Sequence, residues 1–393
     1  MNEQISKVRK AAETCSCGRH EPVAIDPIVI SRDALQQAAI YMAKRQYQRV
    51  VLCVDDHTYE AAGRKLEQVL QEEGIDAAVC VISPNAAGDV VADEASIVQL
   101  MLAIQPSVTQ AVIAAGAGTI HDIVRFAAYR LQLPFLSVPT APSVDGFTSK
   151  GAPIVIRGQK ITVPACAPEA LFADIDVLTA APGELAAAGF GDMLGKYTSL
   201  FDWEFGHAAG GEPYCQAAAS LTREALEACA AHAEEIGRRT EQGIRILMES
   251  LIQSGLAMLL FGQSHPASGA EHHLSHYWEM DFLRRGKRQV LHGAKVAAAS
   301  AVLAQVYREL AEDGRLFPGS ARAQLAAAAR GLPQPERMRA WLRAARAPEM
   351  PEELGIDSGL LARSLREAHL VRPNRFTLLR ARNEQQGQGS AAP

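Results

Sequence analysis

The first 180 residues alternate short apolar, β-branched runs with amphipathic stretches, and this alternation constrains the fold more than any other feature. Strand-like runs lie at 50–54, 78–82, 110–115 and 134–138. Helical spacing follows three of them, at 58–73, 95–104 and 119–131. Strands that alternate with helices in this way form a parallel sheet with helices packed on its faces. Two further runs, joined at Arg157-Gly158, predict a β-hairpin at the edge of that sheet.

Beyond residue 180 helical periodicity continues with few interruptions, in sequence rich in Ala, Leu, Glu and Arg. With 393 residues the chain is long enough for two hydrophobic cores. We therefore predict an α/β protein in which a parallel-sheet domain at 1–180 precedes an all-helical domain at 181–382. The polar segment 383–393 is predicted to be a disordered tail.

Composition narrows the functional class. The net charge is −5, which disfavours a nucleic-acid partner. The N-terminus lacks the apolar segment of a secretory signal, and no apolar run approaches the roughly 20 residues of a membrane span. A cytoplasmic protein with no membrane span is therefore expected.

Seven cysteines, an odd number scattered along the chain, do not suggest a disulfide framework. Cys15-x-Cys17 followed by His20 resembles part of a metal clip. Structural zinc sites usually present four ligands in paired spacings. The preferred interpretation is therefore a frayed polar terminus.

Two strand ends carry signals for a dinucleotide. Gly116-x-Gly118 leaves the third predicted strand and enters a helix, so backbone N–H groups and the helix N-terminus favour a pyrophosphate. The third glycine of the usual fingerprint is absent, and a tight turn without a ligand is an equal alternative. Asp55-Asp56 ends the first predicted strand, where a carboxylate accepts ribose hydrogen bonds and repels a 2′-phosphate. That favours NAD over NADP, although a solvated turn or helix cap explains the same pattern.

The segment 137–149 follows the fourth predicted strand and is dense in hydroxyls and prolines. Ligands bind at the carboxyl ends of parallel strands. Thr140 and Ser149 could hydrogen-bond a cofactor there, and Asp145 could bond a substrate hydroxyl. The alternative is a rigid proline-rich loop.

Three places in the helical half combine metal-binding residue types with apolar surroundings. Asp192 lies in a glycine-rich apolar segment, and a buried carboxylate needs a charge partner or a metal. His272 and His276 share one helical face at i and i+4, and His292 lies in a third segment. One Asp and two His would leave positions open around a catalytic divalent ion. Any single histidine is more often a packed core residue, so these residues alone leave the choice of ligands open.

Several blocks together resemble one family. They lie at 116–122, 139–149, 167–178, 187–200, 265–276 and 291–296. The chain resembles the bacterial branch of the sn-glycerol-1-phosphate dehydrogenases, in the superfamily of iron-dependent alcohol dehydrogenases and dehydroquinate synthases. The resemblance implies a Rossmann-like domain followed by a helical domain, a homodimer, and nickel or zinc, with iron also possible. It departs at His265, where an arginine is expected.

The resemblance also implies roles for individual residues. Asp192, His272 and His292 would hold the metal. Asp145, Asp192 and His276 would contact substrate, with His276 and Asp192 as the catalytic residues. NAD(H), or NADP(H), would be bound by Asp56, Gly118, Thr119, Ile120, His121, Asp122, Thr140, Ala141, Pro142, Ser143 and Ser149.

The implied reaction is the reversible reduction of dihydroxyacetone phosphate, with hydride delivered to C2 and a metal acting as a Lewis acid on the C2 oxygen. The phosphate of this triose needs cationic or N–H donors, for which Lys150, Lys196 and Lys295 are candidates. The alternatives are a glycerol or polyol dehydrogenase on the same fold and a non-catalytic nucleotide- or metal-binding sensor. A cyclase similar to dehydroquinate synthase is disfavoured, because its additional basic residues cannot be placed.

Overall fold

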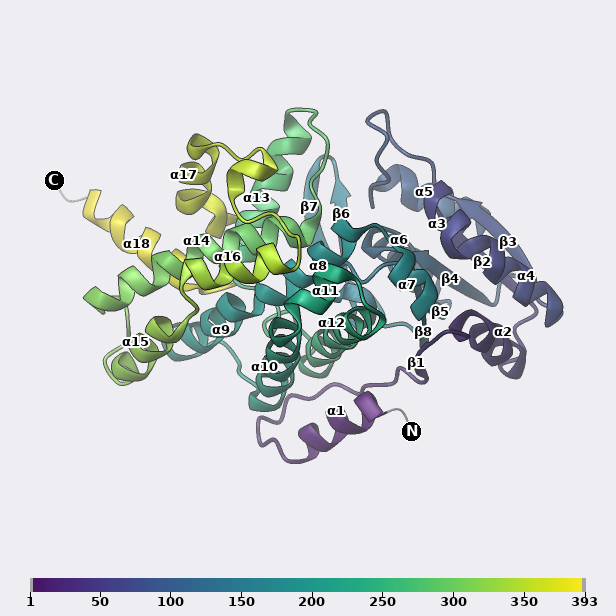
Figure 1. The fold of residues 1–393 in the computed structure, drawn as a ribbon, viewed down its shortest axis with the longest axis horizontal. Coiled ribbons are helices and arrows are strands. Elements are labelled where there is room, and N and C mark those ends of the chain that lie inside the picture. Colours follow the sequence, from purple (N-terminus) through teal and green to yellow (C-terminus); the bar gives the residue numbers. More distant parts are fainter. Residues whose placement is uncertain (1–2, 391–393) are drawn as a thin grey trace.

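A six-stranded parallel sheet forms one end of the molecule, and helices form the rest (Figure 1). The computed structural model describes residues 3–390, and side chains up to residue 387. The strands of this sheet are β1 (Ile28–Ser31), β2 (Arg49–Val54), β3 (Asp76–Val81), β4 (Ala111–Gly116), β5 (Phe135–Pro139) and β8 (Ala170–Asp174). Their order is β1-β8-β5-β4-β2-β3, and every pairing is parallel. The predicted α/β class and the four predicted strands are confirmed.

Helices cover both faces of the sheet. On one face α2 (Ala34–Lys44) and α4 (Arg64–Glu72) pack against the strands, and the short α3 (Asp56–Thr58) and a π-helical turn η1 (Tyr59–Gly63) precede α4. On the other face lie α5 (Glu94–Ala103) and α6 (Gly118–Leu131). All six residues of β4 are buried, as expected of a strand covered on both sides.

The strand order reverses direction between β2 and β4. From β2 the chain moves outward to β3, and then returns to place β4 on the opposite side of β2. Cys53 of β2 is level with Ala114 of β4, and Gly116 is level with Pro139 of β5. The segments that follow these three strands therefore begin side by side. Ligands of parallel sheets bind at such a reversal point.

The predicted hairpin is present, but its predicted place is wrong. Strands β6 (Gly151–Ile156) and β7 (Gln159–Pro164) form a separate antiparallel pair rather than extending the sheet. Arg157 and Gly158 both have positive φ, as a two-residue hairpin turn requires. The buried side of β6, including Ala152 and Ile154, packs beside α6. Packing of this apolar side on a helix, rather than hydrogen bonding to an edge strand, sets the hairpin's position.

After β8 the described chain contains helices without strands. They are α7 (Ile175–Ala180), α8 (Gly183–Leu194), α9 (Lys196–Gly210), α10 (Gln216–Ala231), α11 (Ala233–Arg238), α12 (Glu241–Phe261), α13 (Ala270–Arg284), α14 (His292–Asp313), α15 (Arg322–Gly331), α16 (Pro335–Ala344), α17 (Ser358–Glu367) and α18 (Leu378–Ser390), with 3₁₀ turns η3 (Pro351–Leu354) and η4 (Ala368–Val371). A further 3₁₀ turn, η2 (Asp145–Thr148), lies earlier in the chain, between β5 and β6. Helix α12 is long and apolar enough to cross a membrane, but 72% of its apolar window is buried inside the molecule. It is the central helix of the largest core.

Both ends of the chain differ from the predictions. Residues 383–390 belong to α18, so the predicted disordered tail is wrong for them, and 391–393 lie outside the described residues. At the other end α1 (Glu3–Glu13) buries Ile5 and Val8 against α10 and α12, so the terminus is not frayed. The N-terminal helix thus packs on the helical half, and the division into domains at residue 180 stays a prediction.

Candidate active site

The site begins with an unusually close crossing of α8 and α14. A Cβ atom on Gly191 would lie 2.5 Å from the carbonyl oxygen of Gly293, and one on Gly293 would lie 1.8 Å from that of Ala188. Only hydrogen fits at both positions, so the two backbones touch. The contact brings Asp192, next to Gly191 on α8, towards His292, the first residue of α14.

The three predicted metal ligands converge at this crossing. Asp192, His272 and His292 each offer a ligand atom within 4.8 Å of the others. His272 Nε2 lies 3.8 Å from Asp192 Oδ1, and the rings of His272 and His292 are 5.1 Å apart. Imidazole nitrogens with one carboxylate suit zinc, nickel or iron, and three ligands leave positions open. The donor set therefore fits a catalytic divalent ion.

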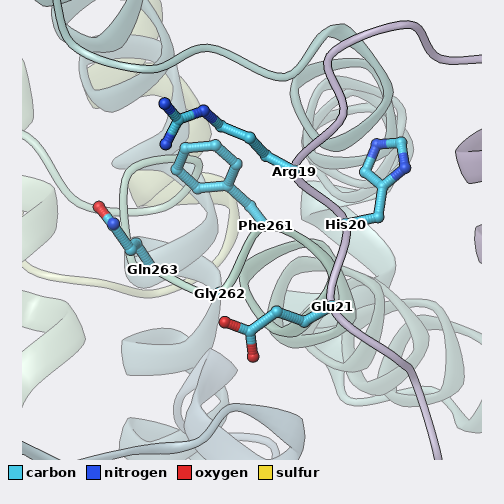
Figure 2. A pocket seen from close by; sticks show the side chains of 6 residues that line it. All are labelled: Arg19, His20, Glu21, Phe261, Gly262 and Gln263. Carbon is cyan, nitrogen blue, oxygen red and sulfur yellow. The ribbon is translucent and has the colours of Figure 1, made fainter.

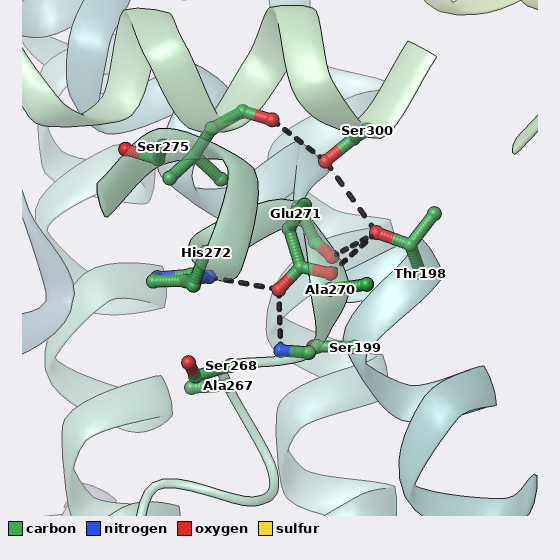
Figure 3. Close-up of polar contacts among 12 residues, drawn as sticks. Thr198, Ser199, Ala267, Ser268, Ala270, Glu271, His272, Ser275 and Ser300 are labelled. Carbon is green, nitrogen blue, oxygen red and sulfur yellow. Dashed lines mark hydrogen bonds and ion pairs between the residues drawn. The ribbon is translucent and has the colours of Figure 1, made fainter. Parts of the chain in front are cut away.

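Glu271 orients the central histidine, and sequence reasoning missed it. Its Oε1 accepts a 2.8 Å hydrogen bond from His272 Nδ1 and one from the Gly269 backbone, while Oε2 accepts from Thr198 (Figure 3). With Nδ1 donating to Glu271, Nε2 of His272 is left to face Asp192. Carboxylate–histidine pairs of this kind fix the tautomer of metal ligands. The available signal was a glutamate directly next to His272 in the sequence.

Lys196 joins the carboxylate of the predicted metal ligand Asp192 to that of Asp145, the predicted substrate contact. Its Nζ lies 2.8 Å from both Asp192 and Asp145, and donates to the Ala267 carbonyl at 3.1 Å. Burial alone would raise the pKa of Asp192, but Lys196 and His272 outweigh it, so that pKa is lowered. Burial and the neighbouring Asp192 raise the pKa of Asp145. Ser254 donates a further 2.8 Å hydrogen bond to Asp145.

His276 lies beside the three predicted metal ligands and is not part of their cluster. Its ring centre is 5.8 Å from that of His292 and 6.4 Å from that of His272. Burial, with the nearby charges of Arg372 and Lys160, holds the pKa of His276 well below its usual range. The ring is therefore neutral. His273, on the same helix, is fully buried, and neither ring nitrogen has a hydrogen-bond partner within residues 3–390.

The predicted dinucleotide residues lie at the carboxyl edge of the sheet. Asp56 is exposed just after β2, while Asp55 forms the N-cap of α3 in a capping box with Thr58. The sequence left a helix cap or a ribose contact open for this pair. Asp55 caps α3, and a ribose contact by Asp56 stays a prediction. Gly118 begins α6, and a Cβ there would lie 2.9 Å from a Val144 methyl group.

Some of the predicted side chains on α6 have partners inside the protein. His121 is buried, with Nε2 2.8 Å from Ser137 Oγ and Nδ1 3.0 Å from the Ala117 carbonyl. Burial lowers its pKa to about 3. Asp122 forms an ion pair with Arg125 at 2.9 Å. The side chains of His121 and Asp122 thus stabilise the turn, whereas Thr119 and Ile120 occupy its first helical residues.

The segment after β5 runs from the sheet edge to α8, the helix that carries the predicted metal ligand Asp192. Thr140 donates its backbone N–H to the Gly116 carbonyl, which joins it to the glycine turn. A Cβ on Gly189 of α8 would lie 1.9 Å from the Pro142 carbonyl oxygen, so this loop also touches α8 directly. Buried Ser143 Oγ has no hydrogen-bond partner among the described residues, and Ala141 beside it is buried. Ser149 Oγ donates to the Gly146 carbonyl.

The predicted phosphate-binding lysines all have carboxylate partners. Lys150 pairs with Glu21, Lys196 with the two aspartates described above, and Lys295 with Glu279 at 3.0 Å. An ammonium group has three N–H donors, and those of Lys196 are all used. It is therefore unsuited to a phosphate.

Arg372 is a cation near His276, and sequence reasoning missed it. It donates to Ser268 Oγ at 2.9 Å and to Thr162 Oγ1 at 3.2 Å, and no carboxylate of residues 3–390 pairs with it. Burial and the nearby Arg375 lower its pKa to about 10, so it stays charged at neutral pH. It follows η4, far from the motifs in sequence, and no local pattern distinguished it.

His265, where an arginine was expected, is a packing residue. It is buried against Trp203 and Phe261, and its Nε2 lies 3.6 Å from Glu212. Burial lowers its pKa to about 3, so it carries no charge for an anion.

Comparison with known proteins identifies the family. Residues 29–182 match the family model described as iron-containing alcohol dehydrogenase. Solved structures of a glycerol dehydrogenase from Schizosaccharomyces pombe (20% identity, TM-score 0.67, covering 91% of this chain and 85% of that one) and of a probable glycerol dehydrogenase from Sinorhizobium meliloti 1021 (16%, 0.67, 92% and 95%) share the fold.

Curated relatives match along the whole chain. The glycerol-1-phosphate dehydrogenase (NAD(P)+) of Geobacillus stearothermophilus is 48% identical, over 98% of this chain and 99% of that protein. That of Bacillus subtilis strain 168 is 46% identical over 98% and 97%. The enzyme of the same name from Pyrococcus furiosus is 30% identical over 90% and 92%. The chain therefore belongs to the glycerol-1-phosphate dehydrogenase family.

Proposed function

We propose that this protein is a metal-dependent, NAD(P)-linked dehydrogenase that interconverts dihydroxyacetone phosphate and sn-glycerol 1-phosphate. The observation that carries the proposal is the convergence of Asp192, His272 and His292, flanked by Asp145 and His276, in a chain of this family. A bound divalent ion would supply Lewis-acid polarisation of a carbonyl oxygen. We further propose a homodimer in the cytoplasm, with nickel or zinc as the ion.

The surrounding side chains have distinct roles in this proposal. Glu271 holds His272 in the tautomer that presents Nε2. Lys196 keeps Asp192 ionised and holds Asp145 in place for a substrate hydroxyl. His276, as a neutral ring, donates or accepts one hydrogen bond to the substrate and orients it rather than acting as a cationic acid.

The sheet edge is the proposed dinucleotide site. The ends of β2, β4 and β5 are adjacent, and the start of α6 presents N–H groups to a pyrophosphate. Exposed Asp56 suits a ribose and disfavours a 2′-phosphate, which favours NAD(H) over NADP(H).

Metal removal is the direct test. Treatment with a chelator should abolish NADH-dependent reduction of dihydroxyacetone phosphate, and adding nickel or zinc should restore it. Full activity after complete removal of the metal would contradict the proposal. Chiral analysis should identify the product as sn-glycerol 1-phosphate. Faster turnover of glycerol would instead favour a polyol dehydrogenase, and NADH binding without turnover of any triose phosphate would favour a sensor.

Arg372 is the proposed phosphate-binding residue, since it is charged, lies near enough to His276 to lower the pKa of that ring, and bonds only hydroxyl groups. Arg372→Gln should raise KM for dihydroxyacetone phosphate by about 10- to 100-fold, as expected for a lost charge-assisted hydrogen bond of about 1.5–3 kcal/mol. Arg366→Gln, on α17, is the control. An unchanged KM in the Arg372 variant would remove Arg372 from the phosphate site.

A further inference from the structure

Four metal-binding side chains meet at a second place, outside the active site. Cys15, Cys17 and His20 follow α1, and Cys215 precedes α10 almost 200 residues later. Their ligand atoms all lie within 4.8 Å of one another. Cys15 Sγ is 3.8 Å from Cys215 Sγ, and His20 Nε2 is 3.1 Å from Cys17 Sγ and 3.4 Å from Cys215 Sγ. The three N-terminal residues thus have the fourth ligand that their sequence lacks.

The separations suit a tetrahedral ion. Zn–S bonds of about 2.3 Å place two sulfurs of a tetrahedron about 3.8 Å apart, the separation of Cys15 and Cys215. A Zn–N bond of about 2.0–2.1 Å gives sulfur–nitrogen edges of about 3.5 Å, close to those of His20. Three thiolates and an imidazole are also the soft donors that select zinc among common divalent ions.

The backbone around the cluster holds these side chains in place. Cys215 is fully buried at the N-cap of the 16-residue helix α10, and its Sγ accepts the Ala218 backbone N–H at 3.4 Å. Gly18 has φ +65°, which turns the chain between Cys17 and His20. Beyond the cluster, Glu21 donates its N–H to the Leu260 carbonyl at the end of α12.

A pocket next to the cluster shows on which side of segment 19–21 the four metal-binding side chains lie. The pocket has a volume of about 290 Å³ and is lined by Arg19, His20, Glu21, Phe261, Gly262 and Gln263. The ring of His20 points to the opposite side of the segment from the side chains of Arg19 and Glu21 (Figure 2). His20 therefore turns away from its charged neighbours and towards the cysteines.

We propose that Cys15, Cys17, His20 and Cys215 bind one zinc ion in a closed structural site that fastens the N-terminal segment to α10. Binding releases the three thiol protons and leaves a net charge of −1 on three thiolates, a neutral imidazole and the ion. All four tetrahedral positions are filled by protein, so the site has no open position for a substrate. A Cys15–Cys215 disulfide would use only two of the four residues and would leave the convergence of the others unexplained.

Metal counting on the purified full-length protein tests the site. A His272→Ala/His292→Ala variant, which lacks two active-site ligands, should still retain one equivalent of zinc by mass spectrometry of the metal. Adding Cys15→Ser and Cys17→Ser to that variant should remove this equivalent. Cys166→Ser, which changes a half-buried cysteine outside the cluster, should leave it in place. Equal zinc content with and without Cys15 and Cys17 would overturn the proposal.

Cobalt substitution gives a test that can be made first on the wild-type chain. Cobalt bound to the wild-type chain should show an intense sulfur-to-metal charge-transfer band in the near ultraviolet, which Asp and His ligands cannot produce. The band should survive in the His272→Ala/His292→Ala variant. Its absence from the reduced wild-type protein, or a Cys15–Cys215 disulfide found by mass spectrometry of freshly purified protein, would show that these residues do not bind metal.

Discussion

Lys196 determines which groups in the site carry charge. Two carboxylates lie 2.8 Å from its ammonium group, and all three groups are buried. Without the lysine, two negative charges would face each other away from water, a costly arrangement that would force one carboxylate to take up a proton. With the lysine, Asp192 stays ionised and available to a cation. Replacing Lys196 would therefore disturb metal binding more than phosphate binding.

The pair Asp55 and Asp56 allows a matched test of cofactor choice. Asp56→Asn removes an exposed carboxylate at the end of β2 and should raise kcat/KM for NADPH relative to NADH, by about 10-fold if it relieves about 1.4 kcal/mol of repulsion. Asp55→Asn is the control, because asparagine preserves the N-cap of α3. Steady-state kinetics with both cofactors measures the ratio. An equal shift in both variants would argue against a ribose contact by Asp56.

The roles of residues in sequence blocks that resemble a known family could be predicted, whereas the roles of other residues could not. Asp192, His272 and His292 lie in blocks that resemble a family, and the structure brings their ligand atoms together. Glu271 is next to His272 in sequence, but its role follows only from the hydrogen bond between them, and Arg372 lies far from the motifs in sequence. The role of Cys215 is another example, since its partners are almost 200 residues away in sequence.

At the scale of elements, the crossing of α8 and α14 determines the spacing of two proposed metal ligands, Asp192 and His292. The backbones touch at Gly191 and Gly293. No side chain therefore lies between the helices at this point that could move to make room for an added atom. The separation of Asp192 and His292 is therefore set by the backbone itself.

A single methyl group at this crossing should separate the ligands. Gly293→Ala places a Cβ 1.8 Å from the Ala188 carbonyl oxygen and should cost about 1–3 kcal/mol through overpacking, with loss of the active-site metal. Gly331→Ala at the end of α15, where a Cβ would meet no atom within 4 Å, should leave both properties nearly unchanged. Thermal unfolding and metal content measure the two effects. A Gly293 variant that kept its metal and its Tm would show that the helices adapt.

Strands buried on both faces could be predicted, and short edge elements could not. β2 and β4 are continuous apolar runs, because helices cover both of their faces. β1 has four residues, of which one is fully buried, so its pattern resembles a loop. The hairpin β6–β7 could be recognised from its turn, but its attachment beside α6 depends on packing between distant segments.

Over the whole molecule, buried and partly buried ion pairs join the sheet half to the helical half. Glu279 of α13 pairs with Lys160 of the hairpin at 2.9 Å and with Lys295 of α14 at 3.0 Å. Side chains of all three are at least 87% buried. Burial alone would raise the pKa of Glu279, but the two lysines outweigh it and lower that pKa well below its ordinary value of 4.5.

The ion pairs of Glu279 should make the free energy of unfolding depend on pH. A lowered folded-state pKa adds stability that is present above pH 4.5, the ordinary pKa of glutamate, and is lost as the pH falls towards the folded value. Glu279→Gln should cost about 3–5 kcal/mol at neutral pH, because two buried lysines lose their partner. Calorimetry should show the difference in Tm from wild type shrinking below about pH 4.5. Glu309→Gln, on the exposed side of α14, should behave as wild type. If the Tm difference between Glu279→Gln and wild type did not change with pH, the lowered pKa of Glu279 would not be its cause.

The backbone N–H of Asp145 donates a 3.0 Å hydrogen bond to Asp192 Oδ2, so the residue proposed to hold substrate is bonded to a proposed ligand of the ion. Two binding equilibria that share a bonded pair are thermodynamically linked, and each must change the other's affinity by the same factor. When the ion is scarce, a smaller fraction of the protein molecules would be active, and substrate would also bind more weakly. Conversely, abundant substrate would help the protein retain its ion against competing chelators in the cell.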